Sequence, residues 1–397
     1  MQSANLTVET MQNRYEAPRP TRSSVLFRNP WLRLIFPPLL LWDAASSIAN
    51  RLFGASIGEK VLSSQKQNFA KQYAGILLNT IKHVNEKEDT LSATRLTVKT
   101  HDGAELDTLQ IKQKHQTAAT QTIIHFVGSG MCYEQIMNDM ILESKDLKCD
   151  SIAFNFRGVS QSAGQATAKS QLVIDGIAQV QRLIDNGTDP QKIILKGHSL
   201  GASIATLVAK HFYDQGITIN LFNGRSFSTL TNHWVGQIRA AATKTGHSET
   251  PTQILIGTLR KPFIKLYLLL TQWEIDAASA YRNLPEAHKE YCVVRSNKSL
   301  RAAHGNKLKD DPIVTHYASL HKAMKHERTK SKTKGSTKKV AAKDPTTNAH
   351  QVRLAELNTR QGATANDFFK SFYHRVAENR AKEAKKTPTE PHKIKPV

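Results

Sequence analysis

A single serine stands on the one segment of this chain whose residue types and spacing favour nucleophilic chemistry. Residues 197–201 read GHSLG, with Ser199 between two glycines. The run before them, Lys192–Lys196, is apolar enough for a buried strand, and Ala202–Tyr213 after them is typical of a helix. A sharp strand-to-helix turn lifts the serine hydroxyl above the strand end, where it can attack a carbonyl carbon. The pattern predicts a covalent intermediate on Ser199.

The elements that must position this turn follow a βαβ pattern. From Leu91 onward, short β-branched or apolar runs are separated by turn residues and longer helical stretches. The central runs carry few charges, as expected of parallel strands covered on both faces. The predicted strands are Thr94–Lys99, Leu106–Ile111, Thr122–Val127, Ser151–Phe156, Lys192–Lys196, Ile217–Phe222 and Tyr291–Arg295, with helices such as Gln171–Asn186 and Ala202–Tyr213 between them.

In this setting the chain resembles the α/β-hydrolase superfamily, from about Thr94 to His350. Three stretches besides the serine turn support the resemblance: HDGAELD at 101–107, HFVGSGMCYEQ at 125–135 and NFRGVSQSAG at 155–164. They resemble the early hairpin, the turn that supplies oxyanion-hole amides, and the turn after the fourth strand. The resemblance implies an α/β-hydrolase fold, with a mostly parallel central sheet flanked by helices, and a serine hydrolase of the esterase or lipase type.

The resemblance also implies two backbone amides that bind the oxyanion of the transition state. One belongs to Leu200, the residue after the nucleophile. The other comes from the glycine-rich turn at 128–130, and we assign it to Ser129, with Gly130 and Met131 as alternatives because the chain has no HGGG run. Each such amide contributes about 3 kcal/mol to transition-state stabilisation.

The order of the superfamily triad places the acid downstream of the nucleophile. The segment NGRSFS after Ile217–Phe222 contains no carboxylate, and the first acids after Tyr291–Arg295 lie in KDDPIVTHYASL. We assign the acid to Asp311, because the proline and apolar pair that follow it resemble the acid turn of the superfamily. Asp310 is the alternative, and Asp276 is a more distant one.

The base follows the acid in the same order. His350, in TTNAHQVRLAEL, comes after a lysine-rich stretch and before a helix-like run, as the last triad residue of the superfamily does. Its neutral imidazole would accept the serine proton, and the carboxylate would orient it. His316 and His321 are the alternatives. The final strand expected directly before the base is not clear in the sequence, where only residues 340–342 are strand-like.

The excess of basic residues indicates which classes of molecule the protein could bind. The chain has 55 Lys and Arg against 33 Asp and Glu, a net charge of +22, which favours anionic membrane surfaces or nucleic acid. The most basic run, 321–343, has no aromatic residues, so nucleic-acid binding ranks last. The three cysteines of the chain do not form a metal-ligand or disulfide pattern. Neither a metal-binding histidine motif nor a nucleotide-binding glycine motif is present in the sequence. The sequence therefore predicts no metal and no cofactor.

The sequence predicts three parts of the chain: an N-terminal extension, a hydrolase domain and a C-terminal tail. Residues 1–90 are predicted as a partly disordered extension with an apolar helix over 31–53, whose segment 31–42 either packs on the domain or lies in a membrane interface. The hydrolase domain, 91–375, is predicted to contain a cap insertion at about 224–290 and a mobile lysine-rich loop at 321–343. Residues 376–397 are predicted as a polar basic tail.

The cap contains the apolar stretch Pro262–Trp273, read either as a buried helix or as the wall of an acyl pocket. Together with the positive charge, it favours an acyl ester or lipid substrate. The N-terminus lacks a secretory signal. We therefore expect a cytoplasmic protein, with peripheral attachment to membranes as an alternative. The lysine-rich pattern also resembles that of effector hydrolases which intracellular bacteria deliver into host cells, and this resemblance implies delivery by a route other than Sec. The hypothesis from another class is an inactive hydrolase-fold protein that binds membranes or protein partners.

Overall fold

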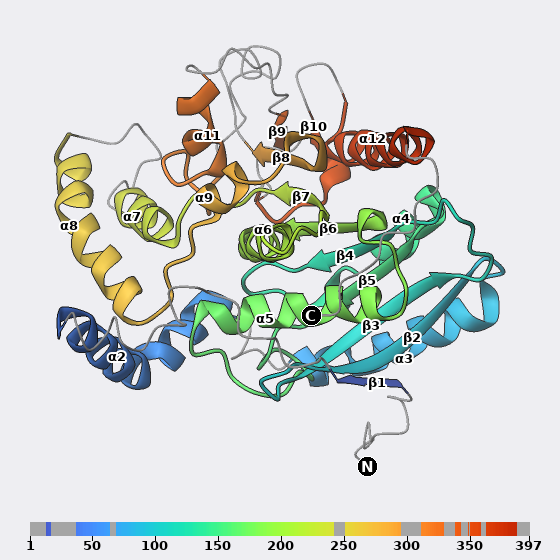
Figure 1. Ribbon diagram of the computed structural model, residues 1–397, viewed down its shortest axis with the longest axis horizontal. Helices are drawn as coiled ribbons and strands as arrows, with labels where there is room; N and C mark the ends of the chain where they lie inside the picture. The colour runs from blue at the N-terminus through green and yellow to red at the C-terminus, as the bar shows by residue number, and fades with distance from the viewer. Residues whose placement is uncertain are drawn as a thin grey trace.

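A ten-stranded sheet forms the centre of the computed structural model, with helices on both faces (Figure 1). The structure describes residues 13–16, 37–63, 69–241, 251–294, 311–328, 338–342, 348, 350–358 and 363–386. The strands are β1 Asn13–Glu16, β2 Leu91–Lys99, β3 Glu105–Gln113, β4 Thr122–Phe126, β5 Asp150–Phe154, β6 Ile193–His198, β7 Asn220–Gly224, β8 Lys289–Val294, β9 Lys338–Ala342 and β10 Leu357–Asn358. The helices are α2 Pro37–Leu62, α3 Phe69–Lys87, α4 Met137–Leu147, α5 Lys169–Asp185, α6 Leu200–Tyr213, α7 Leu230–Ala241, α8 Pro251–Leu270, α9 Ala277–Arg282, α11 Leu320–Arg328 and α12 Ala365–Lys386.

The strand order is β1-β2-β3-β5-β4-β6-β7-β8-β9-β10, and the strands from β5 to β9 in this order run parallel. Only β3 and β10 run antiparallel to their neighbours. Every residue of β4, β5 and β7 is buried, as expected for strands that are covered on both faces. Parallel strands end at one edge of the sheet, so the turns after β4, β6 and β7 converge there.

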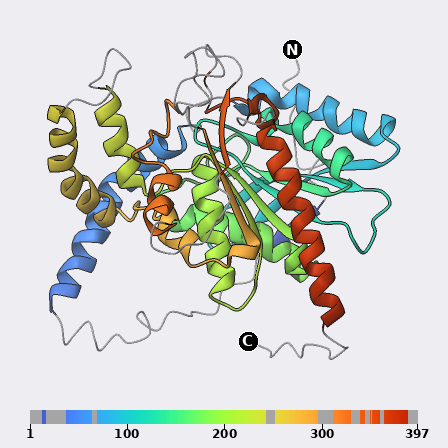
Figure 2. The same ribbon diagram turned by 90° about the horizontal axis from the view of Figure 1, so that it is seen from above.

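The two faces of the sheet are covered by different helices. On β4, Ile124 packs with residues of α5 and α6, whereas Ile123 packs with Phe369 and Phe372 of α12. Successive side chains of a strand point to opposite faces, so one apolar strand serves both layers. The long helix α12 lies over the strands on the second face (Figure 2).

The seven predicted strands and the two predicted helices are all present, with boundaries shifted by a few residues. The fold class predicted for the chain, a mostly parallel sheet flanked by helices, is therefore confirmed. The largest shift is in the strand predicted at Ile217–Phe222, which begins at Asn220 and continues to Gly224. Ile217 instead closes the end of α6, because its amide donates to the Phe212 carbonyl over 2.9 Å.

The apolar helix predicted over 31–53 is wrong in its limits. Helix α2 runs over Pro37–Leu62, and residues 31–36 lie outside the described part of the chain. The two prolines do not interrupt it, because they occupy its first turn, where the missing amide proton has no helical acceptor. The predicted extension also contains α3 and the strand β1, which pairs with β2 along the edge of the sheet.

The lysine-rich loop predicted at 321–343 is wrong at both ends. Helix α11 begins at Leu320 and buries His321 and Met324 against the core, on one face of the helix. Strand β9 pairs with β8, where Val340 is fully buried and the two lysines before it take part through their backbones. Residues 329–337 and 343 lie outside the described part of the chain.

The polar tail predicted to start at residue 376 is also wrong in its limit. Helix α12 continues to Lys386, and Val376 packs with Phe372 in the core of the second face. Lysine and arginine side chains dominate the composition there, but one apolar residue per turn is enough to hold the helix on the sheet. Residues 387–397 lie outside the described residues.

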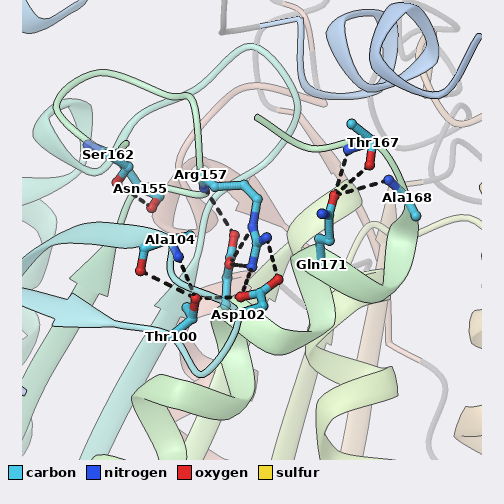
Figure 3. A network of polar contacts seen from close by, with 10 residues as sticks. Thr100, Asp102, Ala104, Asn155, Arg157, Ser162, Thr167, Ala168 and Gln171 are labelled. Carbon is cyan, nitrogen blue, oxygen red and sulfur yellow. Dashed lines mark hydrogen bonds and ion pairs between the residues drawn. The ribbon is translucent and has the colours of Figure 1, made fainter. Parts of the chain in front are cut away.

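An ion cluster around the buried side chain of Arg157 joins two of the motifs that the sequence singled out (Figure 3). Arg157, in the turn after β5, donates to both carboxylate oxygens of Asp102 over 2.7 and 3.0 Å, and Asp102 lies in the β2–β3 hairpin. The same guanidinium donates to Asp175 of α5 over 2.6 and 2.8 Å. The arginine thus holds the hairpin, the strand-five turn and α5 in one arrangement, with both carboxylates satisfied.

The glycines around Ser199 are required by close backbone contacts. A Cβ atom on Gly201 would lie 2.2 Å from the Phe126 carbonyl oxygen, and one on Gly197 would lie 2.2 Å from the Ala202 Cα atom. Both contacts are with backbone, which cannot move out of the way without shifting the strand or helix. The turn therefore tolerates only glycine at these two positions.

We expect Gly201→Ala to lower the free energy of unfolding by about 2–4 kcal/mol, because the added methyl group forces the strand β4 and helix α6 apart. Denaturant unfolding followed by circular dichroism measures this. The matched control is Gly75→Ala in α3, where the new Cβ meets no atom within 4 Å; this variant should gain about 0.5–1 kcal/mol from helix propensity. Equal stability of the two variants would contradict the prediction.

Candidate active site

Ser199 lies on the turn between β6 and α6, with a backbone conformation of φ 54° and ψ −118°. This is a left-handed conformation, which a residue with a side chain adopts only when its surroundings enforce it. Here its amide donates to the Gly224 carbonyl over 2.8 Å, which ties the turn to the end of the neighbouring strand β7. The hydroxyl is thereby held at the edge where the parallel strands end, as the sequence predicted for its position.

The structure brings the three predicted triad residues together. His350 Nε2 lies 2.8 Å from Ser199 Oγ, and His350 Nδ1 lies 2.7 Å from Asp311 Oδ2. All three side chains are buried. With the Nδ1 proton donated to the carboxylate, Nε2 is left to accept the hydroxyl proton, which is the tautomer that a general base requires.

The Asp311 carboxylate is fixed by its own turn. Its second oxygen, Oδ1, accepts from the amides of Ile313 and Val314, each over 2.8 Å. Two amide donors and one imidazole donor hold the carboxylate in one orientation, with Oδ2 directed at His350. The Pro312-Ile313-Val314 sequence that suggested this acid therefore provides the donors that orient it.

The alternative triad residues lie elsewhere. Asp276 caps the first turn of α9 by accepting from the Ser279 amide, and His321 Nδ1 lies 3.3 Å from the Tyr291 hydroxyl. The ring centroid of His316 is 6.4 Å from that of His321, on the side of α11. Asp310 lies outside the described residues.

The amides of the two predicted oxyanion donors, unlike those of their neighbours, have no acceptor within the described part of the chain. The Gly130 amide donates to the Leu62 carbonyl over 2.7 Å, and the Met131 amide donates to the Gly128 carbonyl over 3.3 Å. The Ser129 amide has no acceptor among the described residues, and the Leu200 amide opens helix α6, where the first turn has no helical acceptor. Of the three candidates on the turn after β4, Ser129 is the one whose amide is available.

The turn that carries Ser129 is held in place by a buried polar cluster. Tyr133 donates its amide to Asn155 Oδ1 over 2.9 Å and its hydroxyl to Asp107 Oδ2 over 3.0 Å. Asn155 also donates to Glu134 over 2.9 Å. These contacts join the turns after β4 and β5, so the amides of residues 128–131 keep a fixed position relative to the sheet.

Two residues of the site have no role in the sequence prediction. His198 Nε2 lies 2.8 Å from the His350 carbonyl oxygen, and Arg225 Nη1 donates to the same oxygen and to the Val352 carbonyl, each over 2.8 Å. Together they fix the backbone of the segment that carries the base. The one available signal for Arg225 was its position directly after β7.

Burial controls the protonation of His198. Burial first, and then the charges of Arg225 and His350, hold the pKa of His198 well below its ordinary value. The ring is therefore neutral, and its Nε2 proton is the one donated to the His350 carbonyl. A neutral ring beside the base adds no positive charge, so it does not oppose formation of the His350 imidazolium.

His233 of α7 interacts electrostatically with the base and the acid. Its ring stacks on Phe227 at 5.1 Å, and burial first, with a smaller effect of His350, lowers its pKa to about 4. The ordinary histidine pKa of about 6.5 holds in the unfolded chain. Between these two values the unfolded chain binds the proton and the folded protein does not. The free energy of unfolding is therefore not reduced by His233 above about pH 6.5, and it decreases as the pH falls from about 6.5 toward about 4.

We therefore expect His233→Phe, which keeps the stacked ring but cannot titrate, to lose less stability on acidification. Between about pH 7.5 and about pH 5 the wild type should lose roughly 1–2 kcal/mol more than the variant. Urea unfolding at both pH values measures the difference. Parallel losses in the two proteins would show that another group controls acid stability.

A cavity of about 290 Å³ lies next to the site, between α4 and the ends of β4, β6 and β7. Its lining includes Gly197, His198 and the segment after His350, but none of the three triad residues. Its floor contains the ion pair Lys196–Glu143, and Glu143 Oε2 also lies 3.3 Å from His125 Nε2. The cavity is therefore separate from the reacting atoms of the site.

A mostly parallel sheet that presents a serine on a strand-to-helix turn, with an acid and a histidine from later turns, defines the α/β-hydrolase fold. An α/β-hydrolase from Vibrio vulnificus has the same fold, with a TM-score of 0.50 and 14% sequence identity over 82% of this chain and 92% of that one. Residues 29–356 match the family described as Chlamydia CHLPS protein (DUF818), and the chain belongs to this family.

Two esterases of archaea are similar over smaller parts of the chain. An esterase from Pyrococcus furiosus is 17% identical and has a TM-score of 0.41 over 60% of this chain and 78% of its own. An esterase from Pyrobaculum calidifontis is 13% identical and has a TM-score of 0.37 over 57% of this chain and 73% of its own. No curated protein matches the sequence.

Proposed function

We propose that the protein is a serine hydrolase that cleaves an ester through an acyl-enzyme on Ser199. The observation that carries the proposal is the continuous hydrogen-bonded series Asp311–His350–Ser199, with 2.7 and 2.8 Å contacts. This geometry places a hydroxyl nucleophile, its base and the group that orients the base within reach of one another. The finer assignment to an acyl ester or lipid substrate is part of the proposal and follows from the apolar segments and positive charge.

The proposed reaction has two halves. Ser199 Oγ attacks the ester carbonyl carbon as its proton passes to His350 Nε2, and the Leu200 and Ser129 amides donate to the oxyanion. The C–O bond to the alcohol then breaks, and the alcohol leaves with the proton from His350. In the second half, water attacks the acyl carbon and gives a proton to His350. The bond between that carbon and Ser199 Oγ then breaks, Oγ takes the proton back from His350, and the acid leaves.

Covalent labelling tests the nucleophile. A fluorophosphonate probe should label the full-length protein on Ser199, because the activated hydroxyl attacks phosphorus as it attacks a carbonyl. Ser199→Ala should abolish the label, whereas Ser203→Ala, a buried serine one turn along α6, should keep it. Failure of the folded wild-type protein to react would favour the hypothesis of an inactive hydrolase fold.

A chain-length series of p-nitrophenyl esters tests the substrate class. A preference for long acyl chains is expected if the apolar segments of the cap contact the acyl group, because each buried methylene contributes about 0.8 kcal/mol. Rates that are independent of chain length, in a protein that the probe labels, would retain the serine hydrolase and reject the lipid substrate.

A further inference from the structure

Helices α2 and α8 expose an unusual amount of apolar surface. Of the large apolar side chains that are exposed among the described residues, most lie on these two helices, and Phe263 is 74% exposed and Leu41 73%. The members on α2 are Leu41, Trp42, Ile48, Leu52 and Phe53, and those on α8 are Leu255, Leu259, Phe263, Leu266, Tyr267 and Leu269. We call these residues the α2–α8 face. Exposed apolar patches of this kind mark surfaces that bind another molecule or a membrane.

The two helices form one surface. Ser46 Oγ of α2 donates to the Leu270 carbonyl at the end of α8 over 2.9 Å, and Asn50 donates to the Thr271 carbonyl over 2.8 Å. The rings of Phe53 and Tyr267 lie 6.1 Å apart, so the apolar side chains of the two helices are continuous. The helices lie together at one end of the molecule, away from α12 (Figures 1 and 2).

The expectation that Pro262–Trp273 is a buried helix is wrong for most of its length. Leu268 and Trp273 are fully buried, but Phe263 and Leu266 are exposed. At 100° per residue, Leu255, Leu259, Phe263 and Leu266 form a single stripe opposite Leu268. The helix is thus attached to the core along one side only, and its apolar stripe faces outward.

Charge identifies the partner of this face. Helix α8 contains Arg260, Lys261 and Lys265 and no acidic residue. Arg260 and Lys265 are exposed and, by the same spacing, flank the apolar stripe on its two sides. Long basic side chains that border an apolar stripe can reach lipid phosphates while the stripe enters the acyl region. The net charge of +22 attracts the whole chain to an anionic surface.

None of the helices among the described residues is long and apolar enough to cross a membrane. We infer that the α2–α8 face docks the protein on the surface of an anionic lipid membrane, with the apolar stripe inserted at the headgroup boundary and the flanking cations against lipid phosphates. Binding of this kind needs no chemistry on Ser199, so the inference is independent of the proposed function.

The docked face is connected to the candidate site through α7. Arg239 of α7 donates to Thr258 of α8 over 3.1 Å. Gln237 of α7 donates to the Ile313 carbonyl in the turn that orients Asp311. Docking through the α2–α8 face would therefore place α7, which contacts the turn of the acid, near the membrane surface.

Vesicle flotation with the full-length protein tests the inference. We expect binding to phosphatidylcholine vesicles that contain roughly 30% phosphatidylserine to exceed binding to pure phosphatidylcholine by about tenfold, and to weaken with salt. The Ser199→Ala protein should bind as well as the wild type, which separates this result from the test of the esterase proposal. Equal binding to neutral and anionic vesicles, or no binding to either, would overturn the inference.

Paired variants locate the surface. Leu259→Glu with Phe263→Glu should lower vesicle binding by about 100-fold, because two charges replace the inserted side chains. The matched control is Ile76→Glu, an exposed apolar residue of α3 that is 53% exposed. Arg260→Gln with Lys265→Gln should remove the preference for anionic lipid, whereas Lys82→Gln on α3 should keep it. Thermal unfolding verifies that each variant folds.

Two outcomes would contradict the proposed partner. If the Leu259→Glu, Phe263→Glu protein binds vesicles like the wild type, the α2–α8 face is not the docking surface. If the wild type is a dimer by light scattering and these substitutions give a monomer, the face is an interface between two copies of the chain. A monomeric wild type that binds anionic vesicles through this face supports the inference.

Discussion

Replacing Ser199 by alanine is expected to lower kcat for a p-nitrophenyl ester by about 10⁴- to 10⁶-fold. The covalent route disappears with the hydroxyl, and only the oxyanion amides and substrate binding remain to accelerate attack by water. The buried hydroxyl is small, so the variant should unfold at nearly the same denaturant concentration as the wild type. Steady-state hydrolysis at saturating ester measures the effect, together with an unfolding curve for each protein.

The same experiment extends to His350→Ala, which should cost about as much as loss of the serine. Because the two side chains act as a unit across a 2.8 Å contact, the double variant Ser199→Ala, His350→Ala should be no slower than either single variant. Losses that multiply in the double variant would mean that the two residues act independently, and the proposed proton transfer between them would be rejected.

Asp311→Asn is expected to lower kcat by about 10⁴-fold, the second of the two largest effects. The amide nitrogen of asparagine can donate to His350 Nδ1 and so favour the tautomer that carries its proton on Nε2. That tautomer cannot accept the proton of Ser199. The carboxylate charge that stabilises the imidazolium is also lost, although the side-chain oxygen can still accept from the Ile313 and Val314 amides. Measurement of kcat against pH, beside an unfolding curve, separates this effect from a loss of folding.

Two matched variants identify the acid. Asp276→Asn should leave kcat unchanged, because asparagine caps a helix as well as aspartate and this residue caps α9. Asp310→Asn tests the alternative that the sequence left open. A loss of activity in Asp310→Asn that is as large as in Asp311→Asn would contradict the assignment of Asp311 as the residue that orients the base.

The sequence was a reliable guide where local rules decide the structure. The strands predicted for β4 to β8 are apolar runs between turn residues, and such runs have few alternatives to a buried sheet. It was a poor guide where a few buried residues outweigh a polar composition. The lysines before Val340 and those of α12 suggested solvated chain, but Val340 and Val376 are buried and hold their segments on the sheet. Composition averages over a segment, whereas packing depends on single positions.

The apolar segments that contain α2 and α8 show the opposite error. Their composition indicated burial as well as it indicated a membrane interface, and a periodic stripe looks the same whether a core or a lipid covers it. Phe263 and Leu41 are exposed because α2 and α8 contact one another and the core along one side of each helix, where Leu268 is fully buried and Ser46 and Asn50 bond to the end of α8. Such a distinction depends on the neighbours of a helix, which its own sequence does not contain.

By itself the sequence determined where the turn that carries Ser199 forms, because the glycines at 197 and 201 stand between an apolar strand run and a helical run. Only the tertiary structure decided which carboxylate and which imidazole reach that serine. His350 is 151 residues from Ser199 and 39 from Asp311 along the chain. Contacts over such separations depend on how the sheet orders its strands, and on Arg225 and His198, which hold the backbone of the base.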